Sequence, residues 1–411
     1  MTGAPGPAVP PADRPGRTTP SIWVVPGMAA LLVVAFTGFS GYAALLPVAP
    51  LWAVHGGADT AGAGLVNFVL LGATVATQFF VPAMIRALGW GHVLALGMVL
   101  LGVPALAHVL RDDLPTTLAL SGVRGVGFGI LTVAASAAAV LLVPVERRGA
   151  AVGAYSAALS VPNVLLMPAA AFVAQTWGFG PVFLVSALPL LGIPACYTLA
   201  RHLPDRATHD RAHPEPPLLA TGRRGRLAPY LGMVSPTLIL LAITLAGGAL
   251  ITFAPQMVER GWVAAGGLFA MGLLSALTRW RIGQVADRVG AGPLIWPFVA
   301  LAVVGLAVIA WLVRDRLGTA DVAAWLAACA LLGISYGALQ NLTMLQAFHR
   351  AGPRRVGAAS AVWNAGFDTG TAVGSVLVGA VAVGWGFGVG MGLTAALVLL
   401  TLPLALRSRA D

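Results

Sequence analysis

An acidic and a basic residue each stand inside a long apolar stretch of this sequence. Asp368 lies in SAVWNAGFDTGTAVG, residues 360 to 374, and Arg124 opens RGVGFG, residues 124 to 129. A carboxylate that faces first one side of a membrane and then the other can take up a proton and release it, because water favours its anion and burial its neutral acid. The two residues therefore predict proton or cation chemistry, provided that the stretches around them cross a membrane.

The composition indicates that they do. Of the 411 residues, 58% are hydrophobic and 9% are charged, and the mean hydropathy is +0.88, whereas about a quarter of the residues are charged in a soluble domain. About 20 apolar residues cross ~30 Å of hydrocarbon. With Pro, Gly and charge clusters as boundaries, we place spans at 27–49, 63–84, 93–110, 117–143, 151–174, 179–199, 231–255, 264–282, 294–313, 322–347, 357–381 and 385–406.

These twelve spans fall into two related groups of six. An ungapped shift of 208 residues places Gly125 on Gly333, Phe128 on Tyr336 and Arg147 on Arg355, and such duplication is common in transporters. The sequence thus predicts an all-α polytopic membrane protein with two pseudo-symmetric six-helix bundles. The predicted parts are a disordered cytoplasmic tail (1–22), an N-terminal bundle (23–200), a cytoplasmic linker (201–228), a C-terminal bundle (229–406) and a second tail (407–411).

The charge distribution predicts the orientation. All 24 basic residues are arginine, and with both termini in the cytoplasm nineteen of them, Arg279 included, lie on the inner side and four on the outer side. This asymmetry follows the positive-inside rule. It predicts a multi-pass protein of the inner (plasma) membrane, and it accounts for the net charge of +10 without a nucleic-acid partner.

Asp368 is the one acid of fourteen that falls within a predicted span. Near the bilayer centre an ionised carboxylate costs about 2.5 to 3.5 kcal/mol, so we expect it to couple protons or bind a substrate cation. The alternative is a hydrogen bond between helices, with Asn364 one turn earlier on the same face. Arg124 either shapes the electrostatics of a cavity or extends to the outer surface.

The sequence resembles the major facilitator superfamily, and within it the twelve-span drug:proton antiporters and related efflux carriers. GQVADRVGAG is similar to the signature loop between helices eight and nine at Gly283, Asp287, Arg288 and Gly290. RGVGFG resembles the fourth-helix motif that places an arginine in the membrane, and Pro162 and Pro168 keep part of the fifth-helix antiporter pattern. The resemblance implies a role for Arg124 in proton transfer or in the electrostatics of a cavity.

The signature loop predicts a latch. Gly283 and Gly290 would permit a tight turn with positive φ, and Asp287 would approach the start of helix five, where Arg147 and Arg148 lie. Exposed N–H groups and the helix dipole favour an anion there. We expect Asp287 to help hold the outward-facing state closed on the inside. The alternative is a charged turn that only follows the positive-inside rule.

Polar residues inside the spans are candidates for contacts with a substrate. The resemblance implies a cavity lined by helices one, four, seven and ten, with further donors on neighbouring helices. The candidates are Ser40, Tyr42, Asn67, Gln78, Thr132, Asn163, Thr252, Tyr336, Gln340, Asn341, Trp363 and Asn364. Such a cavity suits an amphiphilic, weakly polar or cationic molecule. The alternative for each residue is that it joins helices to one another.

The sequence therefore predicts a transporter and no enzyme, since HExxH and phosphate-loop patterns are absent. We expect export of a small organic compound, such as a drug-like or amphiphilic natural product or metabolite, by proton antiport with alternating access. The expected partners are the substrate, protons and the lipid bilayer, for a monomer without metal or cofactor that is driven by the proton motive force. The alternatives are a proton-coupled importer or facilitator of a metabolite and, more remotely, a membrane sensor.

Overall fold

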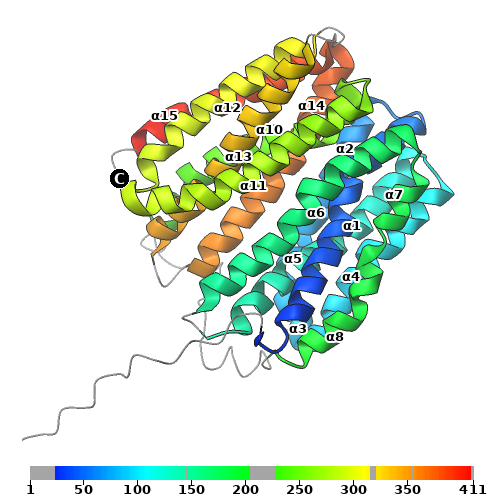
Figure 1. The fold of residues 1–411 in the computed structure, drawn as a ribbon, viewed down its shortest axis with the longest axis vertical. Coiled ribbons are helices and arrows are strands. Elements are labelled where there is room, and N and C mark those ends of the chain that lie inside the picture. The colour runs from blue at the N-terminus through cyan, green and yellow to red at the C-terminus, as the bar shows by residue number, and fades with distance from the viewer. Residues whose placement is uncertain (1–23, 145–146, 204–227, 315–320, 353–355, 409–411) are drawn as a thin grey trace, which may run out of the picture.

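The computed structural model describes residues 24–144, 147–203, 228–314, 321–352 and 356–408 (Figure 1). These residues form helices and no strand. The predicted tail 1–22, most of the predicted linker 201–228 and the last residues of the tail 407–411 lie outside the described residues. The predicted boundaries of the two bundles therefore stay predictions.

The helices follow the predicted spans closely. The N-terminal half consists of α1 (Met28–His55), α2 (Thr60–Gln78), α3 (Val81–Leu88), α4 (Trp90–Ala107), η2 (His108–Leu110), α5 (Leu114–Leu141), α6 (Arg148–Thr176), α7 (Gly180–Val185), η4 (Leu188–Gly192) and α8 (Ile193–Ala200). The C-terminal half consists of α10 (Ala228–Met257), α11 (Gly261–Val289), α12 (Gly292–Leu312), α13 (Asp321–Ala351), α14 (Val356–Leu399) and α15 (Leu402–Arg407).

Eleven helical segments of the described chain are long and apolar enough to cross a membrane. The last of them, Ala359–Arg407, covers the eleventh and twelfth predicted spans except for residues 357 and 358. Gly386 divides these two, because its φ of 78° and ψ of 167° interrupt the helical backbone. The all-α polytopic fold with two sets of long apolar helices is confirmed.

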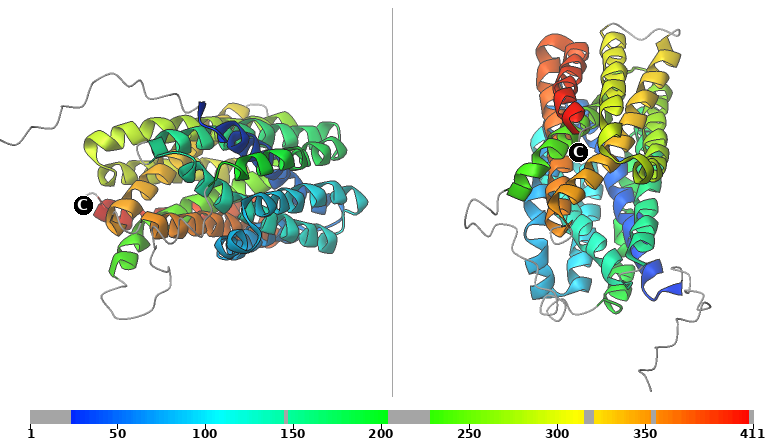
Figure 2. Two further views of the ribbon diagram at one scale, coloured as in Figure 1. Left: turned by 90° about the horizontal axis from the view of Figure 1, so that it is seen from below. Right: turned by 90° about the vertical axis from the view of Figure 1, so that its left-hand side faces the viewer.

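The long helices run side by side, and their ends define two sides of the molecule (Figures 1 and 2). We call the side where α1 begins and α15 ends the termini side, and the side with the connections at 56–59, 111–113, 177–179 and 258–260 the distal side. Two caps start helices on the distal side: Asp59 accepts a hydrogen bond from the Gly62 amide (2.7 Å), and Asp113 from the Thr116 amide (3.0 Å). Such caps satisfy amides that have no partner within the helix.

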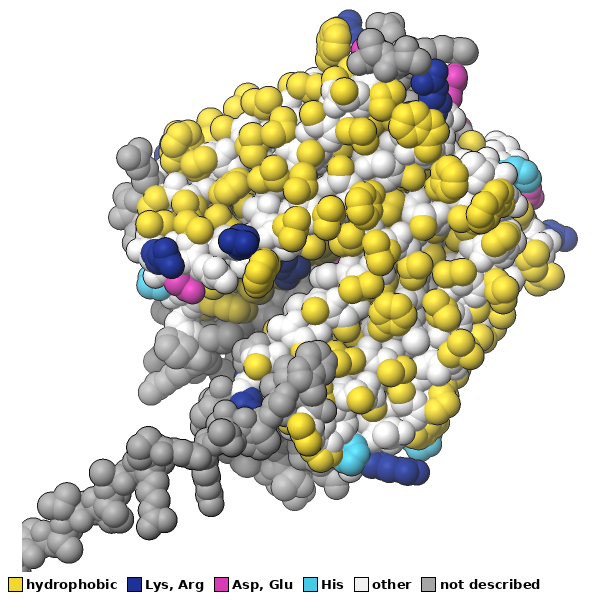
Figure 3. Space-filling model, viewed as in Figure 1, with side chains coloured by type: hydrophobic (Ala, Val, Ile, Leu, Met, Phe, Trp, Pro, Cys, Tyr) yellow, Lys and Arg dark blue, Asp and Glu magenta, His cyan; other side chains and the backbone are white. Residues whose placement is uncertain are grey.

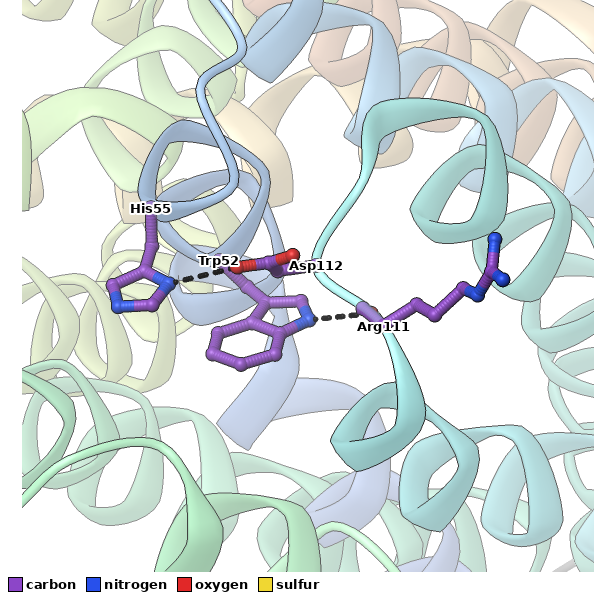
Figure 4. Close-up of polar contacts among 4 residues, drawn as sticks. All are labelled: Trp52, His55, Arg111 and Asp112. Carbon is purple, nitrogen blue, oxygen red and sulfur yellow. Dashed lines mark hydrogen bonds and ion pairs between the residues drawn. The ribbon is translucent and has the colours of Figure 1, made fainter.

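The distal connections of the N-terminal half are joined by side chains (Figure 4). Trp52 Nε1 donates to the carbonyl oxygen of Arg111 (3.0 Å), and His55 Nδ1 lies 3.1 Å from Asp112 Oδ2. The rings of Trp52 and His55 stack with their centroids 5.1 Å apart. These contacts fasten the end of α1 to the residues that precede α5.

Small residues allow the helices of each half to approach closely. A Cβ at Gly125 of α5 would meet the carbonyl oxygen of Leu70 of α2, and one at Gly129 would lie 2.7 Å from that of Thr74. The C-terminal half repeats both contacts: Gly333 and Gly337 of α13 pack in the same way on Met271 and Ser275 of α11. The repeat found in the sequence is thus also a repeat of contacts.

The outer surface is suited to lipid. On the face shown in Figure 3, apolar side chains cover the middle and charged side chains gather towards the two ends. Six tryptophans of the described chain are exposed: Trp177, Trp262, Trp311 and Trp385 near the distal side, and Trp280 and Trp296 nearer the termini side. Tryptophan favours the boundary between hydrocarbon and water, so these rings mark both boundaries of a membrane.

A first prediction concerns Gly374, which packs α14 directly against the carbonyl oxygen of Leu245 of α10. Gly374→Ala would force the two backbones apart, and we expect it to lower the free energy of unfolding by about 1 to 3 kcal/mol. Gly72→Ala in α2 is the matched control, since its new methyl group would meet no atom within 4 Å. Unfolding in detergent measures both; equal stability of the two variants would contradict the prediction.

Candidate functional site

The two halves meet through the pairs α2 with α14, α6 with α11, and α1 with α10. Three hydrogen bonds between the halves form what we call the distal seam. They join Thr60 Oγ1 to the Gly379 carbonyl (3.3 Å), Asn67 Nδ2 to Thr252 Oγ1 (2.9 Å), and Gln175 Nε2 to the Pro255 carbonyl (2.7 Å). The seam closes the distal side, so Asn67 and Thr252 serve here as contacts between the halves.

Towards the termini side the halves part. Figure 3 shows a groove between them that opens on the side where the C-terminus lies in Figure 1. The two halves are therefore joined at the distal side and separated towards the termini side.

Asp368 lies on α14 at the interface between the two halves. Its side chain is 8% exposed, and its Oδ2 accepts a hydrogen bond of 2.8 Å from Nε2 of Gln78 at the end of α2. The same Nε2 atom lies 3.5 Å from Thr132 Oγ1 on α5, which donates to the Gly129 carbonyl (3.1 Å). Three predicted residues, Asp368, Gln78 and Thr132, are thus brought together, and Asp368 is bonded to the opposite half.

Arg124 is completely buried in the N-terminal half. Its Nη2 donates to the carbonyl oxygen of Gly41 on α1 (3.1 Å), while Nε and Nη1 have no hydrogen-bond partner among the described residues. Extension to the outer surface is therefore wrong for this side chain. Arg124 and Asp368 each bond to a different group, and no hydrogen bond joins them.

Aromatic candidates form clusters in both halves. Tyr42 stacks on Phe128 with ring centroids 3.7 Å apart in the N-terminal half. In the C-terminal half, Phe367 lies between Tyr336 (6.3 Å) and Trp363 (5.7 Å). The Phe367 and Asp368 side chains leave neighbouring positions of α14, so the second cluster lies beside the acid.

Three other candidates bond within their own helix. Ser40 Oγ donates to the Phe36 carbonyl (2.6 Å), Asn163 Nδ2 to the Leu159 carbonyl (2.8 Å), and Asn364 Nδ2 to the Ser360 carbonyl (2.8 Å). Asn364 is exposed and does not hydrogen-bond to Asp368. Polar side chains in helices often bond to the preceding turn in this way.

The predicted loop from Gly283 to Gly292 is largely helical, which corrects the sequence analysis. α11 continues to Val289, so Gly283 is a helical residue, and the turn is made by Gly290 with a φ of 84°. A glycine with positive φ ends many helices in this way.

The latch residues are present but apart in this state. Asp287 and Arg288 are exposed on the last turn of α11, and Asp287 forms no ion pair with any described residue. Arg147 and Arg148 lie at the start of α6. The latch stays a prediction for the state in which the termini side is closed.

Arg279 is a site residue that the sequence analysis placed on the inner surface. It lies ten residues before the end of α11, or about 15 Å at 1.5 Å per residue. Its Nη1 donates to Gln340 Oε1 (3.1 Å), and its carbonyl oxygen accepts from Asn341 Nδ2 (2.8 Å). Both partners on α13 were predicted for the cavity. The signal that would have revealed Arg279 is Gly290, the one glycine of the segment that ends the helix.

The family match agrees with this arrangement. Residues 30–375 match the Major Facilitator Superfamily. The chain belongs to this superfamily. Over 98 residues it is 37% identical to an uncharacterized MFS-type transporter of Pseudomonas aeruginosa, and over 97 residues 36% identical to one from a second strain. Each match spans 23% of this chain and 24% of the relative, so the chain matches about a quarter of the length of these curated relatives.

Solved structures resemble the fold over nearly the whole chain. A bacterial homolog of the human lysosomal transporter Spinster, inward-facing and unoccupied, has a TM-score of 0.71 at 13% identity and covers 93% of this chain and 96% of its own. The nucleoside transporter NupG has a TM-score of 0.70 at 12% identity, with 93% and 98% covered. A POT family transporter in complex with 5-aminolevulinic acid has 0.70 at 13%, with 93% and 95% covered.

The bond from Gln78 to Asp368 gives a second prediction. Gln78→Leu removes the donor to a carboxylate within the protein, where such a bond contributes about 1.5 to 3 kcal/mol, so we expect a clearly lower melting temperature of the purified protein. Asn364→Ala removes an exposed amide that bonds its own helix, and we expect little change. The hydrogen bond has no such role if Gln78→Leu melts like the wild type.

Proposed function

We propose that this transporter exports a small organic compound in exchange for protons, and that Asp368 carries the proton. The observation that carries the proposal is the bond between Asp368 of α14 and Gln78 of α2. An acid deep in a membrane protein is costly when ionised, and this one is bonded to the opposite half. Its protonation state therefore bears directly on the interface that must move during transport.

A proton changes this bond through charge. The ionised carboxylate attracts the amide N–H of Gln78 more strongly than the neutral acid does, because charge-assisted hydrogen bonds are roughly twice as strong as neutral ones. Loss of the proton would favour the closed interface of α2 and α14, and its gain would loosen that interface. Arg124 is buried on the other side of the interface and has no carboxylate bonded to it in this state, so its positive charge adds to the electrostatics of the cavity.

Alternating access would use the distal seam as the part that opens. The seam consists of three hydrogen bonds, each worth about 1 kcal/mol net, which is a closure that can break and re-form. With the termini in the cytoplasm, as the arginine asymmetry predicts, the groove faces inward in the described state. The latch between Asp287 and the start of α6 would form when the groove closes.

Export is the direction supported by the resemblance to drug:proton antiporters. Pro162 and Pro168, two residues of the fifth-helix antiporter pattern, lie inside α6, which contacts α11 of the C-terminal half. A comparison of metabolites between cells with and without the protein tests the direction. Accumulation of a compound inside deletion cells supports export and identifies the compound; its depletion there indicates import.

The third prediction is for Asp368→Asn, measured in proteoliposomes with the compound so identified. The amide keeps the shape of the side chain but cannot bind and release a proton. We expect transport driven by an imposed pH gradient to fall about tenfold or more, and exchange of labelled for unlabelled compound to stay within about twofold of wild type. Gradient-driven transport at the wild-type rate would return Asp368 to a structural role.

The fourth prediction concerns the distal seam. A Cβ on Gly261 would lie 3.3 Å from Cβ of Gln175 across the two halves, close to the separation that a disulfide requires. We expect Gln175→Cys combined with Gly261→Cys to form a disulfide that holds the distal side closed and stops transport, with recovery after reduction. The single variants serve as controls, and the native Cys196 and Cys329 are free and buried. Undiminished transport by the oxidised pair would refute alternation at this seam.

A further inference from the structure

Arg279 is a cation that has no role in the proposed proton coupling. It is half-buried within α11, where Gln340 and Asn341 of α13 fix its side chain and its backbone. One N–H of the guanidinium is used by Gln340, and a guanidinium carries five such donors. Within the described chain, no carboxylate forms an ion pair with it.

The position of Arg279 on α11 turns it towards the N-terminal half. Gly261 and Gly272 of the same helix lie against α6: a Cβ on Gly261 would be 2.7 Å from Gln175 Oε1, and one on Gly272 would be 3.5 Å from Cα of Val164. Arg279 follows Gly261 by eighteen residues, which is five full helical turns. It therefore lies on the same side of α11 as the residues that meet α6, ten residues before the end of the helix.

The internal repeat shows what Arg279 corresponds to. Thr74 of α2 contacts α5 in the same way as Ser275 of α11 contacts α13. Gln78 follows Thr74 by four residues and Arg279 follows Ser275 by four, so Gln78 and Arg279 occupy equivalent positions in the two halves. Each reaches its neighbouring helix in the same way, Gln78 towards Thr132 and Arg279 to Gln340.

The partners across the interface differ between the two copies. Gln78 bonds to Asp368 of α14. The shift of 208 residues that relates the two halves places Ser160 of α6 where α14 has Asp368, and the Ser160 hydroxyl bonds to the Ser156 carbonyl of its own helix (2.7 Å). The second copy thus has a cation on one helix and no acid on the opposite helix.

We propose that Arg279 binds the anionic group of the transported compound, so that the substrate is an organic acid carrying a carboxylate or a similar oxyanion. An arginine inside a membrane protein marks a path for substrate or ions, because its charge is costly there without a partner. A guanidinium pairs best with a planar oxyanion through two parallel N–H donors. The hydrogen bond to Gln340 fixes the orientation of these donors before the substrate arrives.

The neighbouring aromatic cluster accommodates the rest of such a molecule. Tyr336 lies one turn before Gln340 on α13, and its ring is 6.3 Å from that of Phe367. An organic acid with a flat apolar body would place its anionic group on Arg279 and its body against these rings. This inference rests on the proposed transport function, and it replaces the weakly polar or cationic substrate expected from the sequence, which had assigned Arg279 to the inner surface.

The test uses three probes of one shape and different charge: benzoate, benzyl alcohol and benzylammonium. Their affinities for the full-length protein in lipid nanodiscs are measured by tryptophan fluorescence. We expect benzoate to bind at least about tenfold more tightly than the other two, as one bond to a charged group implies. Arg279→Gln should weaken benzoate binding by about tenfold or more and leave benzyl alcohol unchanged, and Arg279→Lys should retain part of the affinity.

Arg281→Gln is the matched control. It removes the same charge two residues further along α11, from an exposed side chain whose guanidinium carbon lies 4.9 Å from the centre of the Trp280 ring. We expect it to bind benzoate like the wild type. The proposal is overturned if benzoate does not bind, if benzylammonium binds more tightly than benzoate, or if Arg279→Gln keeps the wild-type affinity. A lower melting temperature of Arg279→Gln with unchanged benzoate affinity would show that Arg279 only fastens α11 to α13.

The outcomes separate this inference from the proton-coupling proposal. Benzoate binding that depends on Arg279 supports the inference even if Asp368→Asn keeps its gradient-driven transport, which would remove proton coupling alone. Benzoate binding that ignores Arg279 removes the inference alone, because the Asp368 experiment requires no particular charge on the substrate.

Discussion

The packing of α2 on α14 is the interaction on which the rest of this structure depends. A Cβ at Gly64 or Gly379 would meet backbone atoms of the opposite half, Ser375 and Thr60 respectively, so the two helices touch through their backbones near the distal side. Lipid tails provide no hydrophobic force to hold helices together, and close contact of small residues takes its place. This contact positions Gln78 to reach Asp368. Further towards the termini side, the two halves part.

Duplication of the six-helix unit explains both the order and the asymmetry of the site. The same glycine contacts hold α2 to α5 and α11 to α13, so each half presents a polar side chain at an equivalent position of its interface. One copy has an amide bonded to an acid, Gln78 with Asp368. The other has Arg279, with Ser160 at the position that corresponds to the acid, so the duplicated scaffold holds one acidic and one basic side chain within its long helices.

The sequence predicted the helices and the acid well because both follow from the absence of water in the membrane. Spans are apolar over a fixed length, and a lone carboxylate within one is conspicuous, so Asp368 and Arg124 were found without coordinates. Arg279 was missed because Gly283 and Gly290 are equally plausible helix ends in the sequence, and choosing the earlier one moves this arginine from the interior of the helix to its end, at the membrane surface. The partners of each polar residue depend on which helices meet, and that is settled by packing over the whole chain. Ser40 and Asn364, for example, were predicted as cavity residues, and the structure shows each bonded to a carbonyl of its own helix.

The exposed tryptophans are distributed unequally between the halves. Five of the six in the described chain, all but Trp177, belong to the C-terminal half, and they lie near both of its ends. Tryptophan rings that prefer the headgroup layer resist vertical displacement. The C-terminal half carries most of these exposed rings, so a thicker or thinner bilayer would act more strongly on that half than on the N-terminal half.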